Sequence, residues 1–185
     1  MPAPIEALCL LARAPRLDAA RLRACLAATG CVDALLAEPP AALRALGLHD
    51  STVAALVAPD RATLESDVAT VEGLGLSLLV AGDAAYPSRL GDIPGAPAVL
   101  WVRGCVATLS QPQLAVVGSR HPTALGRRTA REFAYHFASA GLAITHTSAD
   151  TIDMTVGSSG VVTVDLAAAA ANNELLAGVS IPRLG

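Results

Sequence analysis

The first 75 residues carry apolar side chains at helical spacing, in short runs that stop at proline or glycine. Runs over residues 5–15, 19–30, 32–37 and 40–47 follow this pattern, and Asp18, Asp50 and Asp60 stand where N-caps would begin helices. We therefore predict a module of four to six small helices over residues 1–75, of the helix-hairpin-helix or SAM-like kind. Some such modules bind DNA, but this one is acidic, so we expect it to contact protein.

From residue 76 the pattern changes to short apolar runs typical of buried strands. Strands are predicted at residues 76–82, 98–104, 113–118 and 142–145, with an extended proline-containing loop over residues 83–97 and a helix over residues 123–140. A strand, a helix and a second strand in succession form a βαβ unit, which requires parallel pairing. The predicted fold class is α/β: a helical module (residues 1–75) followed by an incomplete Rossmann-like parallel sheet (residues 76–185).

Composition and charge narrow the classes of function. Hydrophobic residues make up 53% of the 185 residues and charged residues 16%, which predicts a folded core rather than disorder. The net charge of -3 gives no overall basic field to attract nucleic acid. No apolar run approaches the ~20 residues of a membrane span, and the first residues lack a basic, signal-like segment. We expect a cytoplasmic protein without a membrane partner.

Cysteine and histidine spacing gives no metal or redox site. Cys9, Cys25, Cys31 and Cys105 form no CxxC pair, and the four histidines include no HxxxH. We expect buried, free thiols, no metal and no assembled catalytic set.

The segment LAVVGSRHPTALGRRTAREF (residues 114–133) is the strongest candidate site. It predicts a strand, a turn through Gly118, Ser119 and Arg120, and a helix whose first N–H groups would attract phosphate. The turn lacks the glycines of a dinucleotide-binding GxGxxG, and the chain contains no lysine for a P-loop, so no nucleotide cofactor is expected.

Three more arginines and one acid, Glu132, lie on the predicted helix. A helical wheel places Leu125, Ala130, Phe133, Ala134 and Phe137 on an arc that would pack on the sheet. The same wheel places Arg127, Arg128 and Arg131 around the opposite, solvated arc.

YPSRL (86–90), PAVLWVRG (97–104) and above all LAVVGSRHPTALG (114–126) resemble the DprA/Smf family, whose hallmark reads VGSR-x-x-T-x-x-G. The resemblance implies binding of single-stranded DNA in natural transformation, protection of that DNA and loading of RecA recombinase on it. It assigns phosphate contacts to Gly118, Ser119, Arg120 and Thr123, with Arg127 and Arg128 adding attraction. It implies neither catalysis nor a cofactor, and it suggests a homodimer and a SAM-like domain before a Rossmann-like one.

The resemblance weakens after Ile144. Where the family reads I-x-S-G-x-A-x-G-I-D-x-x-A-H, this sequence reads ITHTSADTIDMTVG (144–157), without either glycine of that pattern. One alternative is therefore a truncated or degenerate copy that does not bind DNA. Another is a small Rossmann-like enzyme for a nucleotide or phosphorylated metabolite, which would use VGSSG (156–160) as a second loop.

Overall fold

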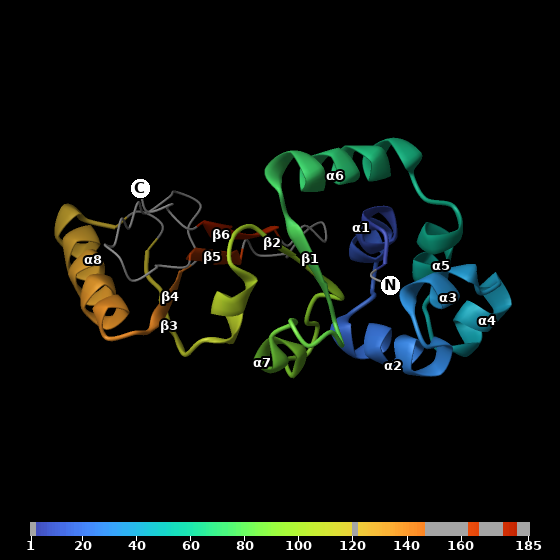
Figure 1. Cartoon of the computed structure of the whole chain (residues 1–185), viewed down its shortest axis with the longest axis horizontal. Helices are drawn as coiled ribbons and strands as arrows, with labels where there is room; N and C mark the ends of the chain where they lie inside the picture. The colour runs from blue at the N-terminus through green and yellow to red at the C-terminus, as the bar shows by residue number, and fades with distance from the viewer. Residues whose placement is uncertain (1–2, 120–121, 147–162, 167–175, 181–185) are drawn as a thin grey trace.

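The computed structural model describes residues 3–119, 122–146, 163–166 and 176–180. Six helices gather at one end of the molecule, and the helix α8 lies at the other end beside the strands β3 and β4 (Figure 1). The six are α1 (Ile5–Arg13), α2 (Ala19–Thr29), α3 (Val32–Ala37), α4 (Pro40–Ala45), α5 (Asp50–Val57) and α6 (Arg61–Leu74). They confirm the helical pattern predicted for the first 75 residues.

The helix starts follow the predicted caps at two of three places. The Asp18 side chain accepts a hydrogen bond from the Arg21 amide, and Asp60 accepts from the amides of Ala62 and Thr63. The prediction for Asp50 is wrong, because His49 is the N-cap of α5 and its ring accepts from the Ser51 amide. Asp50 instead lies in the first turn and pairs with Arg44 at 2.7 Å.

The second part of the chain alternates short strands with helices. Its elements are β1 (Ser77–Val80), α7 (Ser88–Gly91), β2 (Val99–Val102), the 3-10 helix η1 (Val106–Ser110), β3 (Gln113–Val116), α8 (Ala124–Ser139), β4 (Ala143–His146), β5 (Thr163–Leu166) and β6 (Leu176–Ser180). Each predicted strand is present. The proline-containing loop before β2 holds a single helical turn, α7, where only extended chain was expected.

Strand pairing is parallel where the βαβ pattern predicts it. β3 pairs in parallel with β4 in a two-stranded sheet, with Gln113 opposite Ala143 and Val116 opposite His146. The other described strands form a mixed sheet in the order β1-β2-β6-β5, in which β1–β2 and β5–β6 are antiparallel and β2–β6 is parallel. The described strands therefore do not form the single parallel sheet that was expected. The connection from β1 to β2 contains only one helical turn. It therefore brings the chain back antiparallel to β1 and does not form a crossover between parallel strands.

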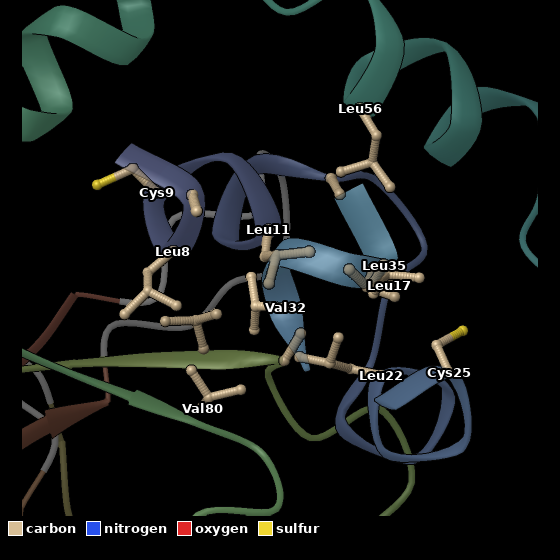
Figure 2. Close-up of a cluster of buried hydrophobic side chains, with 14 of the residues drawn as sticks. Leu8, Cys9, Leu11, Leu17, Leu22, Cys25, Val32, Leu35, Leu56 and Val80 are labelled. Atoms are coloured by element: carbon tan, nitrogen blue, oxygen red, sulfur yellow. The ribbon is translucent and has the colours of Figure 1, made fainter. Parts of the chain in front are cut away.

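The largest hydrophobic core joins the helices to the first two strands. Figure 2 shows Leu8 and Leu11 of α1 above the β1–β2 hairpin, which contributes Val80 to the same cluster. Trp101 of β2 belongs to this cluster too, so one core includes residues from both sides of position 75. Because α1 packs on β1 and β2, the helical part is anchored to the mixed sheet, whereas the candidate site follows β3 of the two-stranded sheet.

The cysteines do not all follow the prediction. None of the four forms a disulfide, as predicted, but only Cys9 and Cys25 are buried, whereas Cys31 and Cys105 are exposed. Burial, together with the nearby Asp67 carboxylate, raises the pKa of the Cys9 thiol to about 11. Cys31 lies at a surface helix start, where its sulfur accepts a hydrogen bond from the Ala34 amide. The prediction of a buried thiol is therefore confirmed for Cys9 and Cys25 and wrong for Cys31 and Cys105.

A part-buried ion pair joins α1 to α6. The Arg13 Nε and Nη2 atoms each donate to one oxygen of Asp67 at 2.7 Å, and the Asp67 side chain is only 8% exposed. A bidentate guanidinium satisfies both carboxylate oxygens, so the charge of Asp67 is tolerated in the core.

We predict that Arg13→Met destabilises the protein by about 3–5 kcal/mol, because it leaves the Asp67 carboxylate buried without its cation. The double variant Arg13→Met/Asp67→Leu should recover most of this loss, since it removes both charges. Urea unfolding followed by circular dichroism measures both. A single variant as stable as the parent protein would show that the ion pair does not hold α6 on α1.

Candidate phosphate-binding turn

The turn after β3 is built by the parallel pairing and by a helix cap. Because β3 and β4 run in parallel, the segment after Val116 emerges at the carboxyl edge of the pair, where open α/β sheets bind ligands. Thr123 is the N-cap of α8, and its hydroxyl oxygen accepts a hydrogen bond from the Gly126 amide at 3.1 Å. The structure places Gly118, Ser119 and Thr123 within this one connection. Arg120 lies outside the described residues.

The two glycines of the turn motif have different surroundings. A Cβ on Gly126 would lie 3.3 Å from the Thr123 Oγ1 atom, so the missing side chain at Gly126 makes room for the cap. A Cβ on Gly118 would meet none of the described atoms within 4 Å, and the φ of Gly118 is outside the left-handed range. The fold around Gly118 therefore gives no conformational reason for glycine, and its backbone is open to an approaching ligand.

The packing of α8 corrects the predicted helical wheel. Ala134 and Ala138 are buried, and Ala130 and Phe137 are half-buried, as a face packed on β3 and β4 requires. However, Leu125 and Phe133 are 62% and 58% exposed, so their predicted packing is wrong. The two-stranded sheet is narrow, and it covers only the arc centred on the small alanines.

The packed face of α8 is therefore rotated around the helix axis relative to the predicted one. As a result, Arg127 lies at the edge of the packed face and not on the solvated arc. Arg127 precedes Ala134 by seven residues and Ala138 by eleven, so all three lie on one stripe of the helix. Arg127 is in the first turn of α8, at the end of this stripe nearest the candidate turn. Its side chain folds back toward the preceding residues, and its Nη1 atom donates to the Pro122 carbonyl at 3.2 Å. Sequence reasoning missed this contact, although a carbonyl just before a helix is free to accept from a nearby arginine. It places a guanidinium on the candidate turn.

Arg128 has a different position from Arg127. It is offset by about 100° around the helix axis, and its Nε atom lies 3.8 Å from the Glu132 carboxylate. Both side chains are about 70% exposed, so this pair is weak and leaves the arginine available to an anion. The structure therefore brings Arg127 to the turn and leaves Arg128 on the neighbouring flank.

Three arginines of the helical part are paired with carboxylates. Arg13, Arg44 and Arg61 pair with Asp67, Asp50 and Glu6 at 2.7–2.9 Å. By contrast, α8 carries Arg127, Arg128 and Arg131 against the single acid Glu132. The surplus of positive charge is concentrated on the helix that follows the turn, in a chain whose net charge is -3.

The YPSRL motif contributes to a separate feature at the opposite end of β3. A hollow of about 520 Å³ is lined by residues 87–90 and 109–113, together with Leu100 and Thr145. Gln113 in its wall already donates to the Leu109 carbonyl and accepts from the Thr145 hydroxyl. Tyr86 is buried and donates to the Pro97 carbonyl at 2.7 Å, and burial raises the pKa of its phenol to about 12. These residues hold the loop together.

In the described part of the chain, no group of three or more histidine, cysteine or acidic side chains is placed to hold a metal ion. The segment 156–160, proposed as a second loop for an enzyme, lies outside the described residues, as do most residues of the diverged segment 144–157. Among the helices that the structure describes, none combines the length and apolar character needed to cross a bilayer.

Comparison with known protein families gives a match. The sequence model of the family described as DNA recombination-mediator protein A matches residues 77–173, which is more than half of the chain. The match begins at β1 and includes the turn and the whole of α8. A search of curated proteins gave no match.

We predict that Thr123→Ala lowers the free energy of unfolding by about 1 kcal/mol, because the Gly126 amide loses its cap. Thr123→Ser and Thr123→Asp should remain close to the parent protein, since both side chains cap helices. Urea unfolding of the three variants checks this. Equal stability of Thr123→Ala and Thr123→Ser would contradict the cap.

Proposed function

The chain belongs to the DNA recombination-mediator protein A family, and from this premise we propose that it binds single-stranded DNA through the turn before α8. Gly118 and Ser119 contribute backbone amides, Arg120 pairs with phosphate, and Thr123 and Arg127 complete the contact. Arg128 adds electrostatic attraction from the adjoining flank. The family assignment gives the general role in DNA recombination, and the single-stranded substrate and the contacting residues are our proposal.

The observation that carries this proposal is the capped N-terminus of α8 beside an open glycine and a guanidinium fixed on the turn. Thr123 caps a sixteen-residue helix, so several of its first amides and the positive end of its dipole face the same region. Arg127 is held there by the Pro122 carbonyl. Backbone amides and arginine bind phosphate without reading a base, which suits a protein that coats DNA of any sequence.

The proposed role requires binding rather than chemistry, so it involves neither a catalytic residue nor a cofactor. We further propose that the protein acts in the cytoplasm during natural transformation, protects incoming single strands and assists RecA loading, as a homodimer. In this proposal the SAM-like module (residues 1–75) contacts protein, and the Rossmann-like domain (residues 76–185) holds the DNA.

We predict that Arg120→Ala weakens binding to a fluorescent dT30 oligonucleotide and reduces the slope of log K against log salt by about 0.7, the value of one single-strand phosphate contact. The matched control is Arg61→Ala, which removes the same charge from a surface ion pair with Glu6 on the helical module. Fluorescence anisotropy at four or five salt concentrations gives affinity and slope together.

Equal affinity and slope for Arg120→Ala and the parent protein would disprove the assignment of Arg120. A parent protein that binds no dT30 at low salt would favour the degenerate copy. Thr123→Asp provides an independent test. It keeps the helix cap but places a carboxylate at the turn, and this carboxylate repels phosphate, so the variant should bind DNA more weakly without losing stability.

A further inference from the structure

The flank of α8 next to its packed face carries three arginines and one exposed aromatic ring. At 100° per residue, Arg127, Arg131, Tyr135 and Arg128 fall within about 100° of one another around the helix axis. Arg128, Arg131 and Tyr135 have the spacing i, i+3, i+7, which aligns side chains along one side of a helix. No acidic residue lies within this arc, which we call the arginine flank; Glu132 lies at its border beside Arg128.

Tyr135 is placed as a surface residue rather than a core residue. It is 56% exposed, whereas the chain's other tyrosine, Tyr86, is buried and hydrogen-bonded. Phe133 is similarly exposed at 58%, but it lies about 160° away around the helix, and its ring stacks on Phe137 with centroids 6.2 Å apart. Of the exposed Phe133 and Tyr135 rings, Tyr135 is therefore the one beside the arginines.

An aromatic ring among cations has the composition of a surface that binds single-stranded nucleic acid. Arginines hold the phosphates, and a nucleobase stacks on the ring whatever its identity. A partner protein with an acidic surface would use the charges but would not need the flat ring. From the turn, the flank runs about 16 Å along the axis to Tyr135, at 1.5 Å per residue.

We propose that single-stranded DNA continues from the turn along the arginine flank and that a base stacks on Tyr135. This rests on the proposed function, and it extends the contact by one element. The DNA then contacts α8 along most of its length, with phosphates on Arg127, Arg131 and Arg128. Tyr135 contributes affinity that depends on the presence of a base and not on charge.

Two probes of equal length and charge separate stacking from phosphate binding: dT30, and a thirty-residue abasic oligonucleotide with the same phosphates. The parent protein should bind dT30 more tightly than the abasic strand. Tyr135→Ala should weaken dT30 binding at least about fivefold, in the range measured for loss of one stacked base. It should leave abasic binding and the salt slope unchanged, because tyrosine carries no charge.

The control variants are Tyr135→Phe, which keeps the ring and should bind as the parent does, and Phe133→Ala, which removes an equally exposed ring from the other side of α8. Thermal melts of all three check that folding is intact. The inference is overturned if Tyr135→Ala binds dT30 as the parent does, or if it loses dT30 and abasic binding equally. Absence of dT30 binding by the parent protein would overturn the proposed function as well.

Discussion

The parallel pairing of β3 with β4 is the constraint on which the candidate site depends. Because the two strands run in the same direction, the chain must cross back through α8, and the connection into that helix emerges at the carboxyl edge of the pair. Thr123 then fixes where the helix begins, by accepting the Gly126 amide. The turn, the helix dipole and the arginines of α8 take their positions from these two features. The helical module packs elsewhere, in the core that α1 shares with β1 and β2, whereas α8 packs with β3 and β4 in a cluster of its own.

The charge distribution differs between the helical module and α8. In the helical module Arg13, Arg44 and Arg61 pair with carboxylates, and the Arg13–Asp67 pair lies part-buried between α1 and α6. On α8 three arginines face a single acid, and one of them is held on the turn by a backbone carbonyl. A protein with a net charge of -3 can therefore offer a local cationic surface to a polyanion. This local concentration matters more for DNA binding than the total charge.

The longer helices and the strands were readable from the sequence, because helix caps and apolar spacing are local signals, whereas the short helical turns α7 and η1 were not. The strand, turn and helix around Gly118, and Thr123 at the helix start, follow from residues close together in the chain. The rotation of α8 was not predictable, because it depends on how wide a sheet the helix meets. A two-stranded sheet covers the alanine stripe and leaves Leu125 and Phe133 outside it. The antiparallel β1–β2 pairing likewise depends on a connection that is too short to hold a crossover helix. At the start of α5, the ring nitrogen of His49 rather than Asp50 caps the helix.

Hydrogen–deuterium exchange with and without dT30 tests the central claim most directly, because it reports on backbone amides without altering the protein. If the turn binds phosphate through its amides, peptides covering residues 117–127 should exchange more slowly in the complex. Peptides from the helical module, such as the one covering α4 and α5, should exchange at the same rate in both samples. Protection confined to the helical module, with no change over residues 117–127 in a sample that binds dT30, would contradict the account.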